Sequence, residues 1–375
     1  MKIAVATTTR ADWGLLSPIA TELRRRGAEV PILAGGMHYD PAMGLTYKEI
    51  EADGLEIAAA VKSAGSPAQI AADCLTGFDE ALRRIKPDCI VCLGDRYEML
   101  AIATAASLRR VPIVHIAGGA ISEGAFDDAF RHAITKLSSL HLTETEEYRR
   151  RVISMGEDPA RVVSTGAIGV YNILSVKPLP QVEIEDFIGM KLGSGSVICT
   201  MHAATLDPIP PEQQLEALLD AFDRFPDVRV LFTHPNNDVD PRPLIRMLEA
   251  FASARPGHAV VVPSLGRVRF LSALRYADAV IGNSSGGIVE VPSMGIPTLD
   301  IGIRQRGRTA ADSVLHCGGS TGEIEAGLRE ILSEDFREKA RHTVNPYGGH
   351  DTLGRICDAI LSTDFSDILP KKFWQ

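Results

Sequence analysis

The sequence predicts an α/β protein made of two doubly wound, Rossmann-like domains in tandem. Short apolar runs alternate with longer helical patterns, and the alternation breaks once near the middle of the chain and then restarts. Several of the short runs are apolar throughout, as is typical of parallel strands that helices cover on both faces. The length of 375 residues also favours two domains rather than one.

The first domain is predicted over residues 1–170. Its expected strands are the apolar runs at 3–7, 30–33, 89–93, 113–116, 140–143 and 162–165. Helical patterns fill the intervals at 15–26, 67–85, 99–109, 125–138 and 145–155. The alternation of strands and helices then stops over 168–183, where Lys177-Pro178-Leu179-Pro180 indicates an interdomain linker.

The second domain is predicted over residues 185–350. Its expected strands are 197–201, 228–233, 259–263, 279–282 and 298–301, with helices at 211–225, 241–254, 268–276 and 287–294. A last helix, 352–362, lies in a C-terminal segment, 351–375, that could pack on either domain. Folds of this kind bind ligands beyond the carboxyl ends of their strands, so the loops that follow the strands carry the candidate site.

Composition argues against some classes of partner. The 39 basic and 48 acidic residues give a net charge of −9, which disfavours nucleic acid as a bulk electrostatic partner. A few local arginines would still suffice to bind a phosphorylated small molecule. The chain opens directly on an expected strand and has no apolar run approaching the ~20 residues of a membrane helix. We therefore expect a cytoplasmic protein with no membrane partner.

Six cysteines are scattered along the chain, and only Cys89 and Cys92 lie close together. Such a CxxC pair can indicate a redox or metal site. Here it lies inside an expected strand, where residues three apart point to opposite faces, and no second Cys or His pair has zinc spacing. We interpret both residues as core cysteines and expect no bound metal.

Two loops of the first domain carry charged groups after expected strands. In Thr7-Thr8-Thr9-Arg10-Ala11-Asp12, hydroxyls and an arginine open a helix, which predicts either an anion site or a simple N-cap with a solvated arginine. No GxGxxG dinucleotide motif is present. Asp95 follows the strand 89–93, where a lone aspartate is usually a helix N-cap.

The loop after strand 113–116 holds further acids. Asp127 and Arg131 are four residues apart at a helix start and so share a face, either in the site or as a surface ion pair. Together with Asp95, the residues Glu123 and Asp127-Asp128 predict a cluster of carboxylates at the strand ends.

The second domain offers groups for a nucleotide diphosphate. His202 ends one strand and suits acid–base work or a phosphate contact, whereas most of the other histidines are expected to be structural. His234 and Asn236 end the next strand. Gly282-Asn283-Ser284-Ser285-Gly286 opens a helix whose start suits a pyrophosphate, with Glu290 two turns on for the ribose hydroxyls. Arg304, after strand 298–301, could neutralise phosphate charge.

Taken jointly, these motifs carry a resemblance to a known family. They are Thr9 to Gly14, Gly94-Asp95-Arg96, Glu123-Gly124 with Asp127-Asp128 and 131–137, and Gly282 to Gly286 with Glu290. The chain resembles the hydrolysing UDP-N-acetylglucosamine 2-epimerases nearly from end to end. The resemblance implies a GT-B-like fold with the active site in an interdomain cleft, and a homo-oligomer, a dimer or tetramer.

The reaction that the resemblance implies converts UDP-N-acetylglucosamine and water to N-acetylmannosamine and UDP, in sialic-acid-like sugar biosynthesis. UDP is eliminated to leave a 2-acetamidoglucal, and water then adds with inversion at C2. The oxidation state of the sugar does not change, so no cofactor is expected.

By the same resemblance, Asp95, Asp127, Arg131 and His202 are catalytic positions and His38 lies on the sugar side. The positions that bind nucleotide are Arg10, Arg96, Asn236, Ser284, Ser285, Glu290 and Arg304.

The chain departs from the family at Ala117 and Ala120, where members commonly carry a glutamate. Three readings stay open: Glu123 replaces that carboxylate, or the substrate is a UDP- or GDP-linked relative such as a 2,4-diacetamido-trideoxy sugar or GDP-N-acetylglucosamine, or the protein is a weakened nucleotide-sugar binder. A non-hydrolysing epimerase has a different loop at 122–128, and only fold analogy supports a glycosyltransferase.

Overall fold

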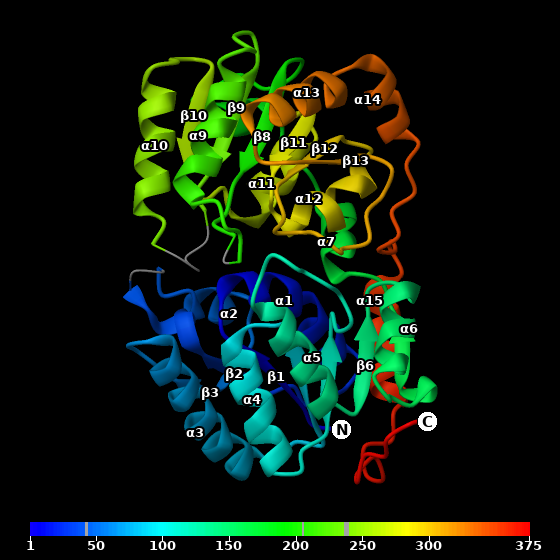
Figure 1. Ribbon diagram of the computed structural model, residues 1–375. Coiled ribbons are helices and arrows are strands. Elements are labelled where there is room, and N and C mark those ends of the chain that lie inside the picture. The colour runs from blue at the N-terminus through cyan, green and yellow to red at the C-terminus, as the bar shows by residue number, and fades with distance from the viewer. Residues whose placement is uncertain (42–43, 205, 236–239) are drawn as a thin grey trace. The chain divides into compact units, whose positions relative to one another are not determined.

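The computed structural model describes residues 1–41, 44–204, 206–235 and 240–375. They form two compact units. Unit 1 consists of Met1–Ala120, Asp127–Tyr171 and Gly348–Gln375, and unit 2 consists of Ile121–Phe126 and Asn172–Tyr347. Each unit is a parallel sheet with helices on both faces, which confirms the predicted pair of Rossmann-like domains (Figure 1). The boundaries predicted at 170, 185 and 350 stay predictions.

The sheet of unit 1 has the strand order β3-β2-β1-β4-β5-β6-β7, all parallel. Its strands are β1 (Ile3–Thr7), β2 (Ile32–Gly35), β3 (Ile57–Val61), β4 (Cys89–Leu93), β5 (Ile113–Ile116), β6 (Leu140–Thr143) and β7 (Val162–Ser164). The order runs outward in both directions from β1 and β4, so the loops after these two strands meet at a topological switch point, where such folds bind ligands.

Helices cover both faces of this sheet. They are α1 (Arg10–Arg25), α2 (Tyr47–Ala52), α3 (Pro67–Ile85), α4 (Tyr97–Leu108), α5 (Asp127–Leu137), α6 (Glu146–Ser154) and α15 (Thr352–Ser362), with a short 3₁₀ turn, η1 (Gly36–Tyr39). Side chains of α1 and α15 form the core on one face, and those of α3, α4 and α5 form it on the other. Cys89 belongs to the first core and Cys92 to the second, so the prediction of two core cysteines on opposite faces is confirmed.

Unit 2 repeats the same topology with the order β10-β9-β8-β11-β12-β13. Its strands are β8 (Ser196–Thr200), β9 (Arg229–Thr233), β10 (Ala259–Val262), β11 (Ala279–Gly282), β12 (Thr298–Ile301) and β13 (Val314–Cys317). Its helices are α8 (Gln181–Ile188), α9 (Pro211–Phe222), α10 (Arg242–Ser253), α11 (Gly266–Leu274), α12 (Ser285–Val289), α13 (Thr321–Ile331) and α14 (Glu334–Arg341). The switch point of this sheet lies between β8 and β11, and the loops after these strands carry His202 and Ser284.

Several expectations about single elements are wrong. The segment 168–183, predicted as a linker, contains α7 (Ile168–Ser175) and the start of α8, and only 176–180 lies between helices. The strands β3 and β13 were not expected. β3 reads Ile-Ala-Ala-Ala-Val, and alanine carries little strand propensity, so its place at the sheet edge is set by pairing with β2. The first helix begins at Arg10 rather than at 15, because Thr9 and Asp12 form a capping box there.

None of the helices in the described ranges combines the length and the apolar character that crossing a bilayer requires.

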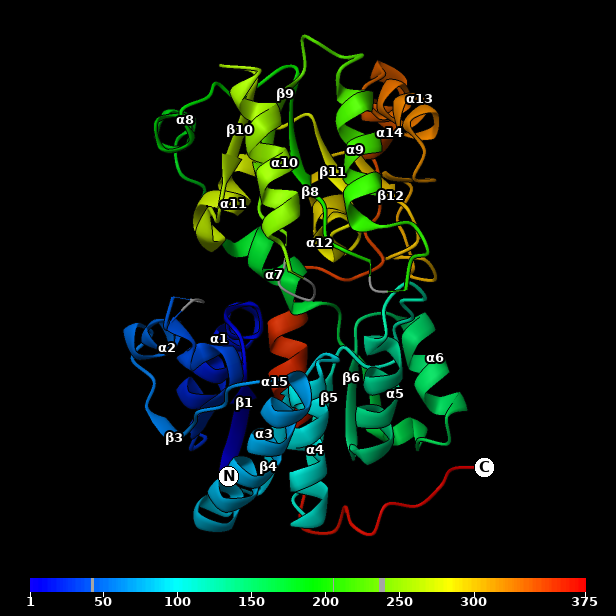
Figure 2. The same ribbon diagram turned by 60° about the vertical axis from the view of Figure 1, so that its left-hand side comes forward.

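The C-terminal segment completes unit 1. The helix α15 lies in unit 1 (Figure 2). Its residues Ile356, Cys357 and Ile360 are fully buried in the same core as Leu16 of α1. Beyond the helix, Lys371 Nζ donates to the backbone oxygens of Thr135 (3.3 Å) and Lys136 (2.8 Å), at the end of α5. Residues near the end of the sequence therefore support the helix that carries Arg131.

We expect Ile360→Ala to lower the free energy of unfolding by about 2–5 kcal/mol, because it leaves a cavity in a fully buried core. Urea denaturation followed by circular dichroism measures the change. Leu108→Ala, at an apolar side chain of unit 1 that is 72% exposed, is the matched control and should change it by less than about 0.5 kcal/mol. Equal effects of the two substitutions would show that α15 is not part of the core.

Candidate active site

Asp95 and Arg131 form the centre of the candidate site in unit 1. Asp95 follows β4, and Arg131 lies on α5 with only 2% of its side chain exposed. One guanidinium nitrogen, Nη2, forms an ion pair with Asp95, while Nη1 donates to Asp128 (2.8 Å) and to the backbone oxygen of Ala120 (2.9 Å). The structure thus brings Asp95, Asp128 and Arg131 together. The alternative of a surface ion pair at Arg131 is wrong, because this arginine is buried.

The ion pair fixes the direction of the Asp95 carboxylate and leaves part of it exposed. A buried cation must be matched by acceptors, and here two carboxylates and a carbonyl surround it. Asp95 keeps 27% of its side chain exposed, so it remains open to a ligand at the switch point. Asp127 is the first residue of α5, next to Asp128. A carboxylate held in this way can accept and return a proton.

Arg96 is held by an acid that the sequence analysis did not single out. Its guanidinium lies 3.2 and 3.1 Å from the carboxylate oxygens of Glu98, which is fully buried. Arg96 caps the start of α4 and retains 27% exposure. The signal for Glu98 was weak, since an acid in the first turn of a helix is common without any role in binding.

His115 is a second residue that sequence reasoning missed. It lies fully buried on β5, with Nε2 2.9 Å from the Gly94 oxygen and Nδ1 3.1 Å from Thr135 Oγ1. Burial lowers the pKa of His115 to about 3, so its ring is neutral at physiological pH.

His38, expected on the sugar side, lies fully buried in η1. Its Nε2 is 2.9 Å from Thr7 Oγ1 and its Nδ1 is 2.9 Å from Thr46 Oγ1. Burial lowers its pKa to about 4. Both ring nitrogens therefore already have hydroxyl partners within unit 1.

The Asp12 carboxylate of the chain itself occupies the anion site expected at the start of α1. The Asp12 carboxylate accepts hydrogen bonds from the backbone N–H groups of Thr8 (2.9 Å) and Thr9 (3.0 Å) and from both of their hydroxyls. The N-cap alternative is therefore the correct one for these residues. Arg10 is exposed beside this turn.

Glu123 lies in the other unit. Its backbone N–H donates to the Arg306 oxygen (3.1 Å), and the neighbouring Gly124 oxygen accepts from Leu206 N–H (3.2 Å). Its side chain is exposed. The expected cluster of carboxylates is therefore shown only for Asp95 and Asp128 in unit 1, and the part expected of Glu123 stays a prediction.

In unit 2, Asn283 ties two strand ends together. Its Oδ1 accepts from His202 N–H (2.7 Å), and its Nδ2 donates to the His202 oxygen (2.8 Å). The preceding Gly282 allows this approach, because a Cβ at that position would lie 1.9 Å from the Thr200 oxygen. The backbone oxygen of Asn283 also accepts a hydrogen bond from Arg304 Nη1 (3.2 Å).

The contacts of Asn283 bring His202, Arg304 and the serines at 284 and 285 to one edge of the unit 2 sheet. Burial, with a smaller contribution from Arg304, lowers the pKa of His202 to about 3. A neutral imidazole beside an arginine and two hydroxyls can donate hydrogen bonds to phosphate oxygens. Asn283 belongs to the predicted motif Gly282 to Gly286, but its role in joining β8 to β11 was not expected.

The position of Glu290 differs from the expectation. The helix α12 covers only Ser285–Val289, so Glu290 ends it rather than standing two turns within it. The carboxylate folds back over the first turn, since a Cβ at Gly286 would lie 2.6 Å from Glu290 Oε2. Glu290 therefore still lies close to the serine turn, although the helix between them is shorter than expected.

The remaining predicted residues lie on the β9 loop. His234 directly follows β9 and is partly buried, and this burial lowers its pKa. Asn236 lies outside the described residues.

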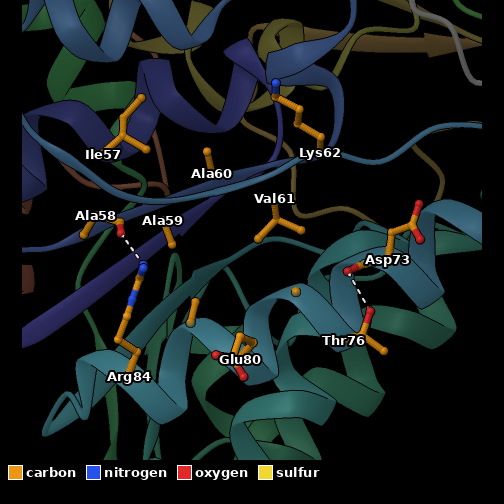
Figure 3. A pocket seen from close by; sticks show the side chains of 12 residues that line it. Ile57, Ala58, Ala59, Ala60, Val61, Lys62, Asp73, Thr76, Glu80 and Arg84 are labelled. Atoms are coloured by element: carbon orange, nitrogen blue, oxygen red, sulfur yellow. Dashed lines mark hydrogen bonds between the residues drawn. The ribbon is translucent and has the colours of Figure 1, made fainter.

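A hollow of about 560 Å³ lies elsewhere in unit 1, between the edge strand β3 and α3 (Figure 3). Its rim carries Lys62, Asp73, Glu80 and Arg84, and Arg84 Nη2 donates to the Ala58 oxygen (2.7 Å). None of the predicted site residues lines it. In the part of the chain that the structure describes, no three His, Cys, Asp or Glu side chains are grouped as metal ligands would be.

The buried histidines of unit 1 predict an acid-sensitive fold. His38 and His115 have lowered pKa values, about 4 and about 3, against 6.5 in an unfolded chain. The unfolded state therefore binds more protons below pH 6.5, and stability is lost as the pH falls from 6.5 toward these folded values. We expect these two histidines to contribute about 3–4 kcal/mol, half from each, to the loss in free energy of unfolding between pH 7 and pH 5.

Urea denaturation at pH 7, 6 and 5 measures the loss, and His38→Gln should reduce the loss between pH 7 and pH 5 by about 2 kcal/mol. The destabilised variant Ile360→Ala should show the wild-type loss. If His38→Gln showed the full loss too, burial of a neutral His38 would not be its cause.

Comparisons with known proteins show which family the chain belongs to. Residues 21–361 match the UDP-N-acetylglucosamine 2-epimerase family. The chain is 32% identical to a GDP/UDP-N,N'-diacetylbacillosamine 2-epimerase (hydrolyzing) of Campylobacter jejuni, covering 90% of this chain and 89% of the relative. It is 33% identical to the polysialic acid biosynthesis protein P7 of Escherichia coli, covering 94% and 91%.

The fold has solved counterparts. The crystal structure of UDP-GlcNAc 2-epimerase from Neisseria meningitidis, bound to UDP-GlcNAc, matches with a TM-score of 0.82 at 18% identity, over 97% of this chain and 100% of that one. Since the family match spans most of the chain and the relatives match over nearly their full lengths, the protein is an enzyme of the hydrolysing UDP-N-acetylglucosamine 2-epimerase family.

Proposed function

We propose that the enzyme converts UDP-N-acetylglucosamine and water to N-acetylmannosamine and UDP. The observation that carries the proposal is the partly exposed Asp95 carboxylate held by the buried Arg131 at the switch point of unit 1. This reaction needs a base and an acid at sugar C2, together with groups that stabilise a leaving diphosphate. Unit 1 supplies the carboxylates, and unit 2 supplies His202, Arg304 and the serine turn.

The proposed steps balance as an elimination followed by a hydration. A base removes the proton at C2, the C1–O bond breaks, and UDP leaves with the bonding electrons, giving the 2-acetamidoglucal. Water then supplies a hydroxyl to C1, and C2 receives a proton on the opposite face. Asp95 and Asp127 are the proposed proton carriers. Arg131 orients Asp95, while His202 and Arg304 stabilise the diphosphate.

The remaining predicted residues bind the nucleotide sugar in this proposal. Ser284 and Ser285 hold the phosphates, Glu290 accepts the ribose hydroxyls, and Arg10, Arg96, His234 and Asn236 complete the binding of the substrate. Both ring nitrogens of His38 are engaged by Thr7 and Thr46, which supports a role in shaping the sugar side through these hydroxyls. The resemblance also supports a homo-oligomer.

The alanines at 117 and 120 bear on the identity of the sugar. Ala117 has a positive φ of 67°, and Ala120 is 1% exposed with its oxygen bonded to Arg131. Neither position supplies a carboxylate, so we propose that Glu123 replaces it. The similarity to an enzyme named for N,N'-diacetylbacillosamine favours a second candidate, a 2,4-diacetamido-trideoxy sugar on UDP or GDP. The similarity to a polysialic acid protein supports a place in sialic-acid-like sugar synthesis.

A proton NMR time course in deuterated water tests these substrates. The purified protein is incubated separately with UDP-N-acetylglucosamine and with UDP- and GDP-linked diacetylbacillosamine. Free UDP together with N-acetylmannosamine deuterated at C2 would establish the proposed reaction. Turnover of only a diacetamido sugar would favour the second candidate, and saturable UDP binding without turnover of any of them would contradict both.

Asp95→Asn should abolish sugar release while UDP affinity stays within a few-fold of wild type, because the change removes the proton acceptor and leaves unit 2 intact. UDP release in a coupled assay and isothermal titration calorimetry measure the two quantities. Asp358→Asn, at an exposed acid of unit 1, is the matched control and should retain wild-type turnover. Normal turnover in Asp95→Asn would show that the catalytic assignment is wrong.

Glu290→Ala should weaken UDP binding by about 1–3 kcal/mol, the range for a lost charged hydrogen bond. Calorimetric titration with UDP gives this value directly. Glu338→Ala changes an acid on the surface of α14 in the same unit, with 54% exposure, and should leave the affinity unchanged. An unchanged dissociation constant in Glu290→Ala would remove this residue from the nucleotide site.

A further inference from the structure

The two partners of the Asp95–Arg131 ion pair come from different elements, the loop after β4 and the helix α5. A single buried side chain contacts both of them. His115 Nε2 lies 2.9 Å from the oxygen of Gly94, the residue before Asp95. Its Nδ1 lies 3.1 Å from Oγ1 of Thr135, one helical turn after Arg131. His115 therefore links the backbone on one side of the ion pair to the helix on the other.

The hydrogen bonds fix the tautomer of this histidine. A carbonyl oxygen can only accept, so Nε2 carries the proton that is donated to Gly94. A neutral ring then has a lone pair on Nδ1, which accepts from the Thr135 hydroxyl. The same hydroxyl lies 3.1 Å from the Arg131 oxygen, and its single proton can be donated to that oxygen or to His115 Nδ1, but not to both at once. His115 thus joins the Gly94 oxygen to the Thr135 side chain of α5.

The surroundings keep this link in place. A Cβ at Gly118 would lie 2.9 Å from His115 Nδ1 and 3.0 Å from Thr135 Oγ1, so glycine is needed there for the two side chains to meet. From the other side, Lys371 Nζ donates to the backbone oxygens of Thr135 and Lys136. Thr135 is therefore held both by its side chain, through His115, and by its backbone oxygen, through Lys371.

We propose that His115 is a positioning residue, which holds the Gly94–Asp95 turn and the Arg131 helix in the register that forms the ion pair. The proposal rests on the proposed function, in which Asp95 acts on the sugar. His115 does not touch the substrate in this account and acts through Asp95. Loss of His115 should therefore lower kcat and leave the nucleotide contacts proposed for unit 2, from Ser284, Ser285 and Glu290, unchanged.

Two substitutions separate its two contacts. In His115→Gln the amide nitrogen can reach the Gly94 oxygen as Nε2 does, whereas the shorter side chain of His115→Asn retains only the contact with Thr135. We expect kcat to fall at least tenfold in His115→Asn and less than about threefold in His115→Gln. KM for the nucleotide sugar and the dissociation constant of UDP should stay within twofold in both variants. Thr135→Val, which removes the hydroxyl and keeps the bond to Gly94, should lower kcat about as little as His115→Gln.

Val114→Ala is the matched structural control. Val114 is fully buried on the same strand, but it belongs to the core on the opposite face of the sheet. It should lower the melting temperature without changing kcat. If Val114→Ala lowered kcat as much as His115→Asn, or if His115→Gln gave no rescue, the role of His115 would be general packing and the proposal would be overturned.

Hydrogen–deuterium exchange supplies a readout that needs no substrate. The amides of residues 94–96 should exchange about tenfold faster in His115→Asn than in the wild type, and at the wild-type rate in Val114→Ala. If the wild type turned over no nucleotide sugar, the proposed function would fail, and the exchange rates would still decide the positioning role. Unchanged exchange at 94–96 in His115→Asn would overturn it.

Discussion

A guanidinium almost completely removed from water must be matched by acceptors, and in this protein that requirement falls on Arg131. Satisfying it takes a carboxylate from the β4 loop, another from α5 and the carbonyl of Ala120. Three separate pieces of backbone must therefore converge within hydrogen-bond distance of one side chain. Three features hold these pieces of backbone in place. They are the turn at 117–120, the link through His115, and the support of α5 by the C-terminal segment.

The fold was largely predictable because it depends on patterns that are local in sequence. Apolar runs marked the central strands in both units, where both faces are covered. The two strands that escaped prediction, β3 and β13, lie at the sheet edges. The helices α2, α7, α8, α13 and α14 also escaped prediction. β3 is rich in alanine, and its conformation is set by pairing with β2 rather than by its own residues. The helix α7 escaped because the prolines that follow it suggested a longer irregular segment.

The candidate site was predictable in its residue types but not in its partnerships. Asp95 and His202 were singled out from their places after the strands β4 and β8, at the switch points, and Arg131 from its place at a helix start, four residues after Asp127. Sequence could not show that Asp12 fills the anion position at the start of α1, since the choice between an internal and an external carboxylate depends on side-chain geometry. The same holds for Glu290, where a helix shorter than expected ends at Val289 and the carboxylate lies over Gly286 in its first turn.

The chain returns to unit 1 only after unit 2 has been completed, and this order has a consequence for synthesis. The helix α15 and Lys371 belong to the core and the helix support of unit 1, yet they are translated only after unit 2. Unit 2 is made almost entirely from one continuous stretch and can fold while translation continues. Unit 1 must wait with an incomplete core until α15 has been made, so its final assembly follows the synthesis of unit 2 and depends on contacts between segments that lie far apart in the sequence.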